Sequence, residues 1–254
     1  MSYSLIVVRA ETLGEAWERA VAKLMENGFD RKVDAPEYQC MTKDSPMLII
    51  VHNPQKEPKL SPKSMQNREV VEEYAKNLIN GMPAEQENKF DYSYFARLRC
   101  YPDCIVRAGL PNVANAEEDE AAVQNLTSGR CVVERIDQVA KAIEIFKRDP
   151  TRRSVVLHTW IPKRDLEKFT PERRTTSSPC LVLIHPQIVE GKLHFFVVMK
   201  TNDLFNAWPG NAFAFVALQE HMAEKIGIDV GTYNHFSVSM QIYEDMYEQA
   251  RAIK

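Results

Sequence analysis

Apolar residues recur along this chain at helical spacing in some segments and in short continuous runs in others. The helical spacing predicts helices over 12–27, from about 63 to 80, from Val132 to the Asp149-Pro150 step, and over 212–226. Gly28, Gly81 and Gly227 follow three of these segments, and glycine is favoured just beyond the end of a helix. Proline disfavours helical geometry in the residue before it, so Pro150 ends the remaining one.

The continuous runs predict strands at 5–8, 46–51, 154–160, 180–189, 192–200 and 236–243. Glu190-Gly191 separates two of them and is a favoured two-residue hairpin turn. Because strands and helices are mixed irregularly around this hairpin, we expect an α+β fold built on one large mixed sheet flanked by helices. No Gly-, Ser- or Pro-rich linker divides the chain, which predicts a single domain over 1–254.

Charge and cysteine content narrow the class of protein. The net charge of −3 gives no electrostatic footprint for nucleic acid or an anionic membrane, so any phosphate site must be local. No apolar run approaches the roughly 20 residues that a membrane helix needs. The 5 cysteines, irregularly spaced, predict a reducing compartment, with the cytoplasm as the default, and together with scattered histidines they fit no standard zinc pattern. The acidic segment 115–121 is interpreted as an exposed loop.

Residues that carry chemistry gather at the open end of the predicted hairpin. Cys180 begins its first strand after Ser178-Pro179. The second strand runs into Lys200-Thr201-Asn202-Asp203, and Trp208-Pro209-Gly210-Asn211 follows. A hairpin brings these ends together, so a thiol would face a cation, a hydroxyl, a carboxylate and amides. Such a site suggests covalent chemistry on a small, phosphorylated, hydrogen-bonding ligand.

The order of these motifs resembles that of the thymidylate synthase family. That family has Asp-Pro-x-Ser-Arg-Arg, a tryptophan strand, Pro-Cys-His, a Gly-Lys-Leu turn, Arg-Ser-x-Asp, Pro-x-Asn and His-x-Tyr in succession. The matching segments here are Asp149-Pro150-Thr151-Arg152-Arg153, Trp160, Pro179-Cys180-Leu181, Gly191-Lys192-Leu193, Lys200-Thr201-Asn202-Asp203, Pro209-Gly210-Asn211 and Gln241-Ile242-Tyr243. Upstream, a gap-free comparison matches Lys63 and Glu73 with the lysine and glutamate of the family's first active-site helix, and the segment from Tyr94 is similar to its Tyr-Gly-x-x-Trp-Arg.

The resemblance implies one-carbon transfer to C5 of a pyrimidine nucleotide. A thiolate, here Cys180, would add to C6, and the resulting enolate would attack a methylene group carried by a reduced pterin. The donor would be 5,10-methylene-tetrahydrofolate or methylene-tetrahydromethanopterin. Glu73 would relay protons at O4 and C5, Tyr94 would help to remove the C5 proton, and Asp203 would hydrogen-bond the pterin ring.

The same resemblance implies how the nucleotide, dUMP, would be held. Arg152, Arg153, Lys200 and Thr201 are the candidates for its phosphate, since guanidinium groups match phosphate oxygens. In the family this arginine pair reaches across a homodimer interface, and spacing does not assign either arginine to its own or the partner's site.

The base and the sugar have candidates of their own. Asn211 would donate to O4 and accept from N3–H, which favours uracil, although an asparagine before a helix is also a good N-cap. Gln241 keeps a hydrogen-bond donor where the family has a histidine, and Tyr243 would bind the sugar hydroxyl.

Departures from the family pattern leave the product open. Leu181 and Gln241 replace two histidines, and the family's closing C-terminal tail has no counterpart after Tyr243, so short archaeal thymidylate synthase-like proteins are the nearer models. Trp208 and its apolar neighbours would then supply a lid.

We expect thymidylate synthesis from dUMP, with a pyrimidine nucleotide 5-hydroxymethylase acting on dUMP, dCMP or CMP as the alternative. A non-catalytic nucleotide-binding relative is the alternative from another class, but such a module does not need the thiol.

Overall fold

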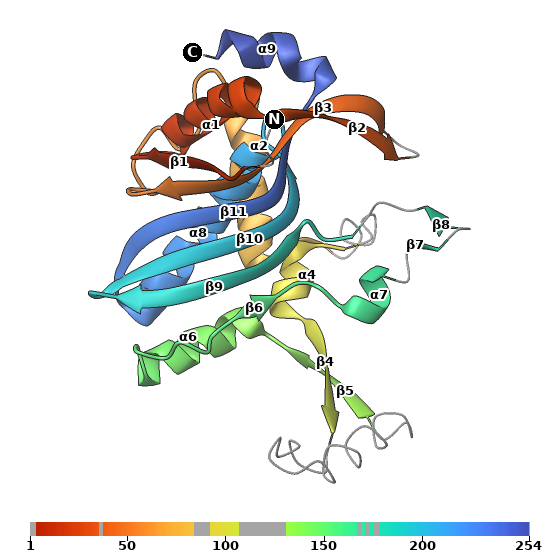
Figure 1. Ribbon diagram of the computed structural model, residues 1–254. Coiled ribbons are helices and arrows are strands. Elements are labelled where there is room, and N and C mark those ends of the chain that lie inside the picture. Colours follow the sequence, from red (N-terminus) through yellow and green to blue (C-terminus); the bar gives the residue numbers. More distant parts are fainter. Residues whose placement is uncertain are drawn as a thin grey trace.

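The fold is organised around a mixed sheet of seven strands (Figure 1). The computed structural model describes residues 4–35, 38–83, 92–106, 131–166, 169–170, 173–174 and 178–253. The strand order is β1-β3-β11-β10-β9-β6, and β2 pairs with β3 outside this path. The strands are β1 (Ile6–Ala10), β2 (Phe29–Ala35), β3 (Tyr38–Val51), β6 (Leu157–His158), β9 (Leu181–Val189), β10 (Lys192–Asp203) and β11 (Asp229–Tyr243). The pairs β1–β3 and β10–β11 are parallel and the others antiparallel, which confirms the expected α+β fold.

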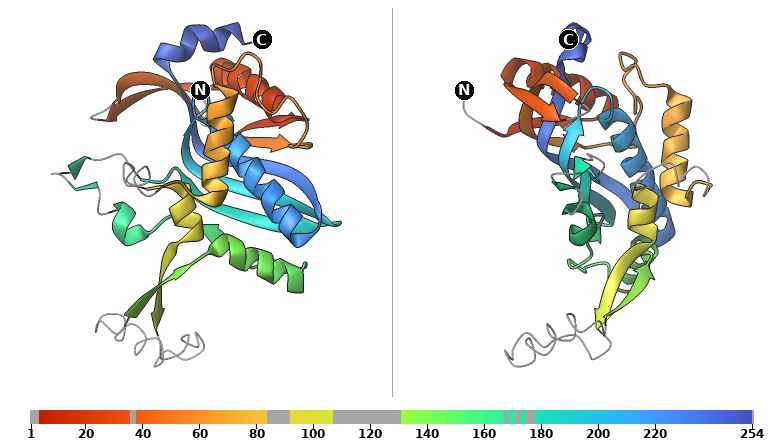
Figure 2. Two further views of the ribbon diagram at one scale, coloured as in Figure 1. Left: turned by 180° about the vertical axis from the view of Figure 1, so that it is seen from behind. Right: turned by 90° about the vertical axis from the view of Figure 1, so that its right-hand side faces the viewer.

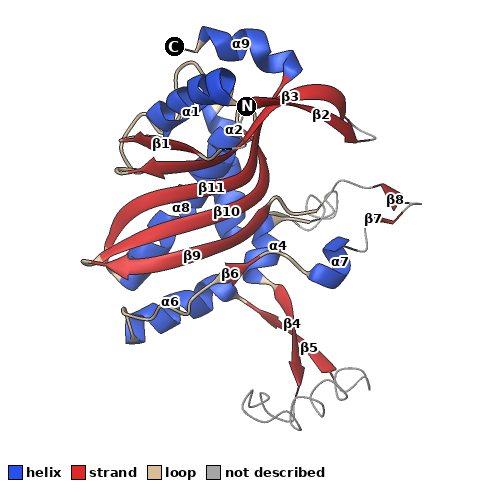
Figure 3. Cartoon of the chain, viewed as in Figure 1, coloured by secondary structure: helices blue, strands red, loops and turns tan. Residues whose placement is uncertain are grey.

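Helices pack mainly against one face of this sheet (Figures 1 and 3). They are α1 (Leu13–Asn27), α2 (Arg68–Asn80), α4 (Tyr94–Arg99), α6 (Gln138–Arg148), α7 (Pro162–Leu166), α8 (Trp208–Ile226) and α9 (Tyr247–Ala252), with a 3₁₀ turn at Glu244–Met246. Two small hairpins, β4 (Tyr101–Val106) with β5 (Cys131–Ile136) and β7 (Phe169–Thr170) with β8 (Arg173–Arg174), lie apart from the sheet.

The central helix α8 is buried on almost every side. Trp208, Phe213, Phe215, Leu218 and Met222 are all among its buried residues. The sheet covers one side of α8, and α2 covers the other, so that in Figure 2 the sheet, α8 and α2 form successive layers. A helix that is apolar all round is expected in such an interior position. It forms the inner wall against which the candidate site is built.

Several predicted elements differ from the observed ones for identifiable reasons. The helix predicted from about 63 begins at Arg68, where the Asn67 side chain caps it. The helix predicted from Val132 is wrong in its first part, because 131–136 pairs with β4 as a strand and α6 begins at Gln138. The strand predicted at 154–160 is reduced to the two residues that pair with β9. The acidic segment 115–121 lies outside the described residues.

The start of α8 corrects two expectations. The helix begins at Trp208 and not at Ala212, with Ala207 at its N-cap position and no side-chain capping bond. Asn211 therefore lies inside the first turn, and its interpretation as a helix cap is wrong. Trp208 has no exposed surface and packs edge-on against His235, so it does not form a lid.

A buried ion pair connects α4 to α7. Arg97 donates to both carboxylate oxygens of Asp165 over 2.8 and 2.7 Å, and to the carbonyl oxygen of Thr159 over 2.7 Å. The backbone N–H of Ile161 donates to Asp165 as well. Both side chains are almost fully buried. This arrangement holds α4, which carries Tyr94, beside the strand that begins after Cys180.

We predict that Asp165→Ala lowers the free energy of unfolding by about 3–5 kcal/mol, because it leaves a buried guanidinium without its counter-charge. Urea denaturation followed by circular dichroism measures this. Glu72→Ala is the matched control, since Glu72 pairs with Arg68 on the surface and its loss should change the midpoint little. Equal shifts for the two variants would contradict a structural role for the buried pair.

Candidate active site

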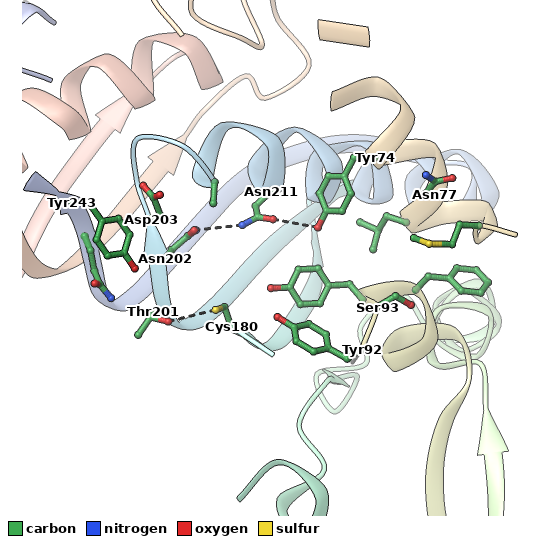
Figure 4. A pocket seen from close by; sticks show the side chains of 16 residues that line it. Tyr74, Asn77, Tyr92, Ser93, Cys180, Thr201, Asn202, Asp203, Asn211 and Tyr243 are labelled. Carbon is green, nitrogen blue, oxygen red and sulfur yellow. Dashed lines mark hydrogen bonds between the residues drawn. The ribbon is translucent and has the colours of Figure 1, made fainter. Parts of the chain in front are cut away.

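A pocket of about 500 Å³ lies where the ends of β10 and β11 meet α8, α2 and α4 (Figure 4). This volume is within the usual range for sites that bind small molecules. The sheet contributes Thr201, Asn202, Asp203, Gln241 and Tyr243, and Cys180 lies just before β9. The start of α8 contributes Ala207 and Asn211, and α2 and the residues beyond it contribute Tyr74, Asn77, Leu78 and Met82. The remaining lining residues, from α4 and just before it, are Tyr92, Ser93, Tyr94 and Phe95.

Strand register explains why the polar residues of the sheet converge. Thr201, Asn202 and Asp203 are consecutive at the end of β10, and all three line the pocket. In the parallel pair β10–β11, Asp203 lies opposite Gln241. On the other edge of β10, the Lys200 N–H donates to the Cys180 carbonyl oxygen over 2.9 Å. This bond places the Cys180 thiol 3.5 Å from the Thr201 hydroxyl.

Tyrosine hydroxyls surround the thiol. The Tyr94 hydroxyl accepts a hydrogen bond from the Leu181 N–H over 3.2 Å, and the Tyr92 hydroxyl interacts with both Tyr94 and the backbone of Cys180. Burial raises the pKa of Tyr92 to about 12 and that of Tyr94 well above its usual value. Both hydroxyls therefore keep their protons at neutral pH, which leaves them available as hydrogen-bond donors to a ligand.

A half-buried cation lies on the opposite side of β10 from Thr201. The Lys200 ammonium donates to the Ser178 hydroxyl and lies 5.2 Å from the centre of the Trp160 ring. Burial lowers the pKa of Lys200, and its attraction to a negative Cys180 opposes that effect. Lys200 is not among the residues that line the pocket, so its role would be to act on the thiol through space.

Asp203 serves the local fold as well as the pocket. Its carboxylate accepts from the N–H groups of Phe205 and Asn206 over 3.0 Å each, and from the Asn206 side chain over 3.1 Å. Burial raises the pKa of Asp203 despite these bonds. It is the only carboxylate among the described lining residues.

The structure thus brings seven of the predicted site residues to one pocket: Tyr94, Cys180, Thr201, Asp203, Asn211, Gln241 and Tyr243. Glu73 is not among them. It is exposed on α2, whereas its neighbour Tyr74 faces the pocket, because one residue turns the helix by about 100°. Arg152 and Arg153 are also exposed and lie outside the pocket.

Sequence reasoning missed the contribution of α2. Val70, Tyr74 and Leu78 recur at helical spacing on α2, but Val70 is 65% exposed while Tyr74 and Leu78 line the pocket. The hydroxyl of Tyr74 was the available signal, since a polar tip on a buried stripe usually has a partner. That partner is Asn211, whose Oδ1 lies 3.2 Å from the Tyr74 hydroxyl.

Comparison with known proteins agrees with this geometry. A family model described as Thymidylate synthase matches residues 45–253. The chain is 30% identical over 241 residues to a Methanocaldococcus jannaschii protein provisionally named a thymidylate synthase, covering 95% of this chain and 92% of that protein. A protein of Methanosarcina barkeri with the same provisional name is 26% identical over 97% of this chain and 94% of its own length. The chain belongs to the thymidylate synthase family.

More distant members of the thymidylate synthase family match only in part. The thymidylate synthase of Listeria monocytogenes is 28% identical over 118 residues, which are 46% of this chain and 35% of that protein. Family membership indicates a one-carbon transferase with a methylene-tetrahydrofolate type of co-substrate.

Among the residues that the structure describes, no helix has the length and apolar character needed to cross a membrane, and no three metal-ligating side chains cluster.

Proposed function

We propose that this protein methylates C5 of dUMP through a covalent adduct of Cys180, with a methylene-tetrahydropterin as the one-carbon donor. The observation that carries the proposal is the position of the thiol. Cys180 lies in the wall of a pocket that also presents the amide of Asn211, the hydroxyls of Thr201 and Tyr243, and the carboxylate of Asp203. A pure binding module has no use for a nucleophile at this place, and the predicted cytoplasmic location would keep that thiol reduced.

The chemistry needs proton transfer as well as a nucleophile. Addition of the thiolate to C6 moves negative charge onto O4 and C5, and C5 then bonds the methylene carbon and loses its proton. Tyr94 and Tyr92 are protonated hydroxyls next to Cys180, so they can stabilise charge on the ring by hydrogen bonding. Exposed Glu73 has no such position in this arrangement. We therefore assign the hydrogen bonds that stabilise negative charge on the ring to the tyrosines, and the C5 proton would leave to a water molecule that these hydroxyls hydrogen-bond.

The remaining pocket suits a flat heterocyclic co-substrate. Leu78, Met82 and Phe95 contribute apolar surface, and Asp203 contributes an acceptor for ring N–H groups. The pterin would supply the one-carbon unit and, for a methyl product, the hydride. A lining this rich in aromatic and apolar side chains limits water around an exocyclic methylene group, and this favours the methyl product over the hydroxymethyl one.

A second copy of the chain is part of the proposal, because the sheet has an uncovered apolar face. Among the described helices, none lies in front of β9–β11 in Figure 1. Strand register places four partly exposed apolar residues in one row across this face: Leu48, Phe236, Val198 and Leu183. Nearby Phe196 and Val238 are 45% and 46% exposed. Apolar surface gathered in this way is typical of a protein interface.

The two arginines lie at the edge of this open face. The Arg153 carbonyl oxygen is 3.1 Å from Nε2 of His185, and His185 pairs with Phe196. Arg152 and Arg153 are exposed and lie outside their own chain's pocket. A second copy packed on the open face would therefore receive them at its own site, where they would bind the nucleotide phosphate.

We predict that Cys180→Ser slows release of tritium from 5-tritiated dUMP by roughly a thousandfold or more, because a hydroxyl is a far weaker nucleophile at neutral pH. Binding of dUMP should remain, since the two side chains have nearly the same shape. Cys100→Ser is the matched control, because that cysteine contacts Arg135 away from the pocket. Normal release by Cys180→Ser would rule out the covalent mechanism.

We predict that two inactive variants restore activity to each other. In a mixed dimer of Cys180→Ser with Arg152→Ala/Arg153→Ala, one site combines an intact thiol with the partner's intact arginines, so an equal mixture should regain about a quarter of wild-type activity. Sedimentation velocity checks that dimers form, and refolding from denaturant ensures exchange. Dimers without any recovery would mean that the arginines do not serve the partner's site.

We predict that the product nucleotide carries a methyl group when a suitable methylene-tetrahydropterin is supplied. Mass spectrometry separates this product from the hydroxymethyl nucleotide, which retains an oxygen from water. Tetrahydrofolate and tetrahydromethanopterin donors are tested in turn, with Cys180→Ser as the blank. A hydroxymethyl product alone would move the protein to the 5-hydroxymethylases while leaving the role of Cys180 intact.

A further inference from the structure

An asparagine does not by itself distinguish uracil from cytosine. Uracil presents a donor at N3 and an acceptor at O4, whereas cytosine presents an acceptor at N3 and a donor at N4. An amide has a donor and an acceptor side by side, and half a turn about its last bond exchanges them. Asn211 could therefore read either base unless its amide is held in one orientation.

Asn211 is the middle of a chain of hydrogen bonds that runs into the core (Figure 4). On one side, its Oδ1 accepts from the Tyr74 hydroxyl over 3.2 Å. On the other, its Nδ2 donates to Oδ1 of Asn202 over 3.4 Å. Beyond the pocket, Nδ2 of Asn202 lies 3.3 Å from Nε2 of His235, and Nδ1 of His235 lies 2.8 Å from the Tyr233 hydroxyl.

Most members of this chain could reverse their roles, because hydroxyls, amides and a neutral imidazole can each donate or accept. Met199 is different. Its thioether sulfur can only accept, and it lies 3.1 Å from Nδ2 of Asn202. An Asn202 carbonyl oxygen turned toward the sulfur would bring two acceptors together in a fully buried place. The sulfur therefore fixes the NH₂ group of Asn202, and through it the direction of every bond out to Tyr74.

His235 is consistent with that direction. Burial lowers the pKa of His235 to about 3, so the ring is neutral at physiological pH. With Nε2 accepting from Asn202, the single ring proton lies on Nδ1 and is donated to Tyr233. Asn211 is then left with one N–H on its Asn202 side and one oxygen lone pair on its Tyr74 side for a ligand.

We propose that Met199, acting through Asn202, and Tyr74 hold the Asn211 amide in one orientation, and that this orientation selects uracil over cytosine. The proposal rests on the proposed function, because it assumes a pyrimidine nucleotide in this pocket. Met199, Asn202 and Tyr74 are positioning residues for base recognition. Cytosine in the same pose would set donor against donor and acceptor against acceptor.

The first test compares the affinities for dUMP and dCMP by isothermal titration. Met199→Leu keeps the volume of the side chain and removes the acceptor, so the ratio of the two dissociation constants should fall about threefold to tenfold toward unity. Met47→Leu is the matched control, as Met47 is equally buried in the same sheet. Tyr74→Phe should lower the ratio too, with Tyr247→Phe on α9 as its control. A merely structural effect would weaken both nucleotides equally, and an unchanged ratio in Met199→Leu would overturn the proposal.

The second test needs no nucleotide. Nitrogen-15 NMR of histidine-labelled protein, with the His235 signals assigned from a His235→Gln variant, reports which ring nitrogen carries the proton. We expect a neutral ring protonated at Nδ1 throughout pH 6–8. A proton on Nε2 would reverse the chain and overturn the proposal. If the wild type binds neither nucleotide, the proposed function fails and base selection fails with it, whereas the NMR result still decides the direction of the chain.

Discussion

The candidate site depends on one constraint, which is that the last residues of β10 pair with a neighbouring segment on both edges. On one edge, the Lys200 N–H is hydrogen-bonded to the Cys180 carbonyl oxygen, and on the other, Asp203 lies opposite Gln241 in β11. A slip of one residue would turn Thr201 and Asp203 to the opposite face of the sheet. The buried side chains that precede them on β10, such as Val197 and Met199, prevent that slip because they would lose their places in the core. The packing of the core thus sets the geometry around the thiol.

The sequence allowed the part of the site that depends on local rules to be predicted. A two-residue turn at Glu190-Gly191 sets the register of β9 and β10 as far as Leu183 and Val198, beyond which the register shifts by one residue. Spacing from the turn could therefore place Cys180 near Thr201 to within one residue. The phase of α2 could not be deduced in this way. Glu73 and Tyr74 are adjacent, and only contact with α8 decides which of them faces inward. The start of α8 was also beyond local rules, because Ala207 provides no capping signal.

The polar strands were missed for a related reason. β2 has the sequence Phe-Asp-Arg-Lys-Val-Asp-Ala, which offers little apolar pattern, and it is stabilised by pairing with β3. The first half of β11 contains Asn234 and His235, which look like loop residues. They are buried because specific partners satisfy them: Asn234 donates to the Phe195 carbonyl oxygen, and His235 meets Asn202 and Tyr233. These hydrogen bonds connect residues that are far apart in the chain, so the spacing of apolar residues along the sequence does not reveal them.

The two faces of the sheet have different surroundings, and this explains where polar and apolar residues lie. On the helix-covered face, polar atoms near the site are buried, and an unpaired one would cost about 1–3 kcal/mol. The bonds from Tyr74 through Asn211 and Asn202 to His235 meet that demand, and a fully satisfied buried network is rigid. On the open face, partly exposed residues such as Phe196 and Phe236 face outward, where apolar contact with a second copy would be favourable. Since the same strands form both faces, a dimer that packs on one would restrain the register that positions the thiol on the other. Assembly and catalytic geometry would then depend on a single set of strand pairings.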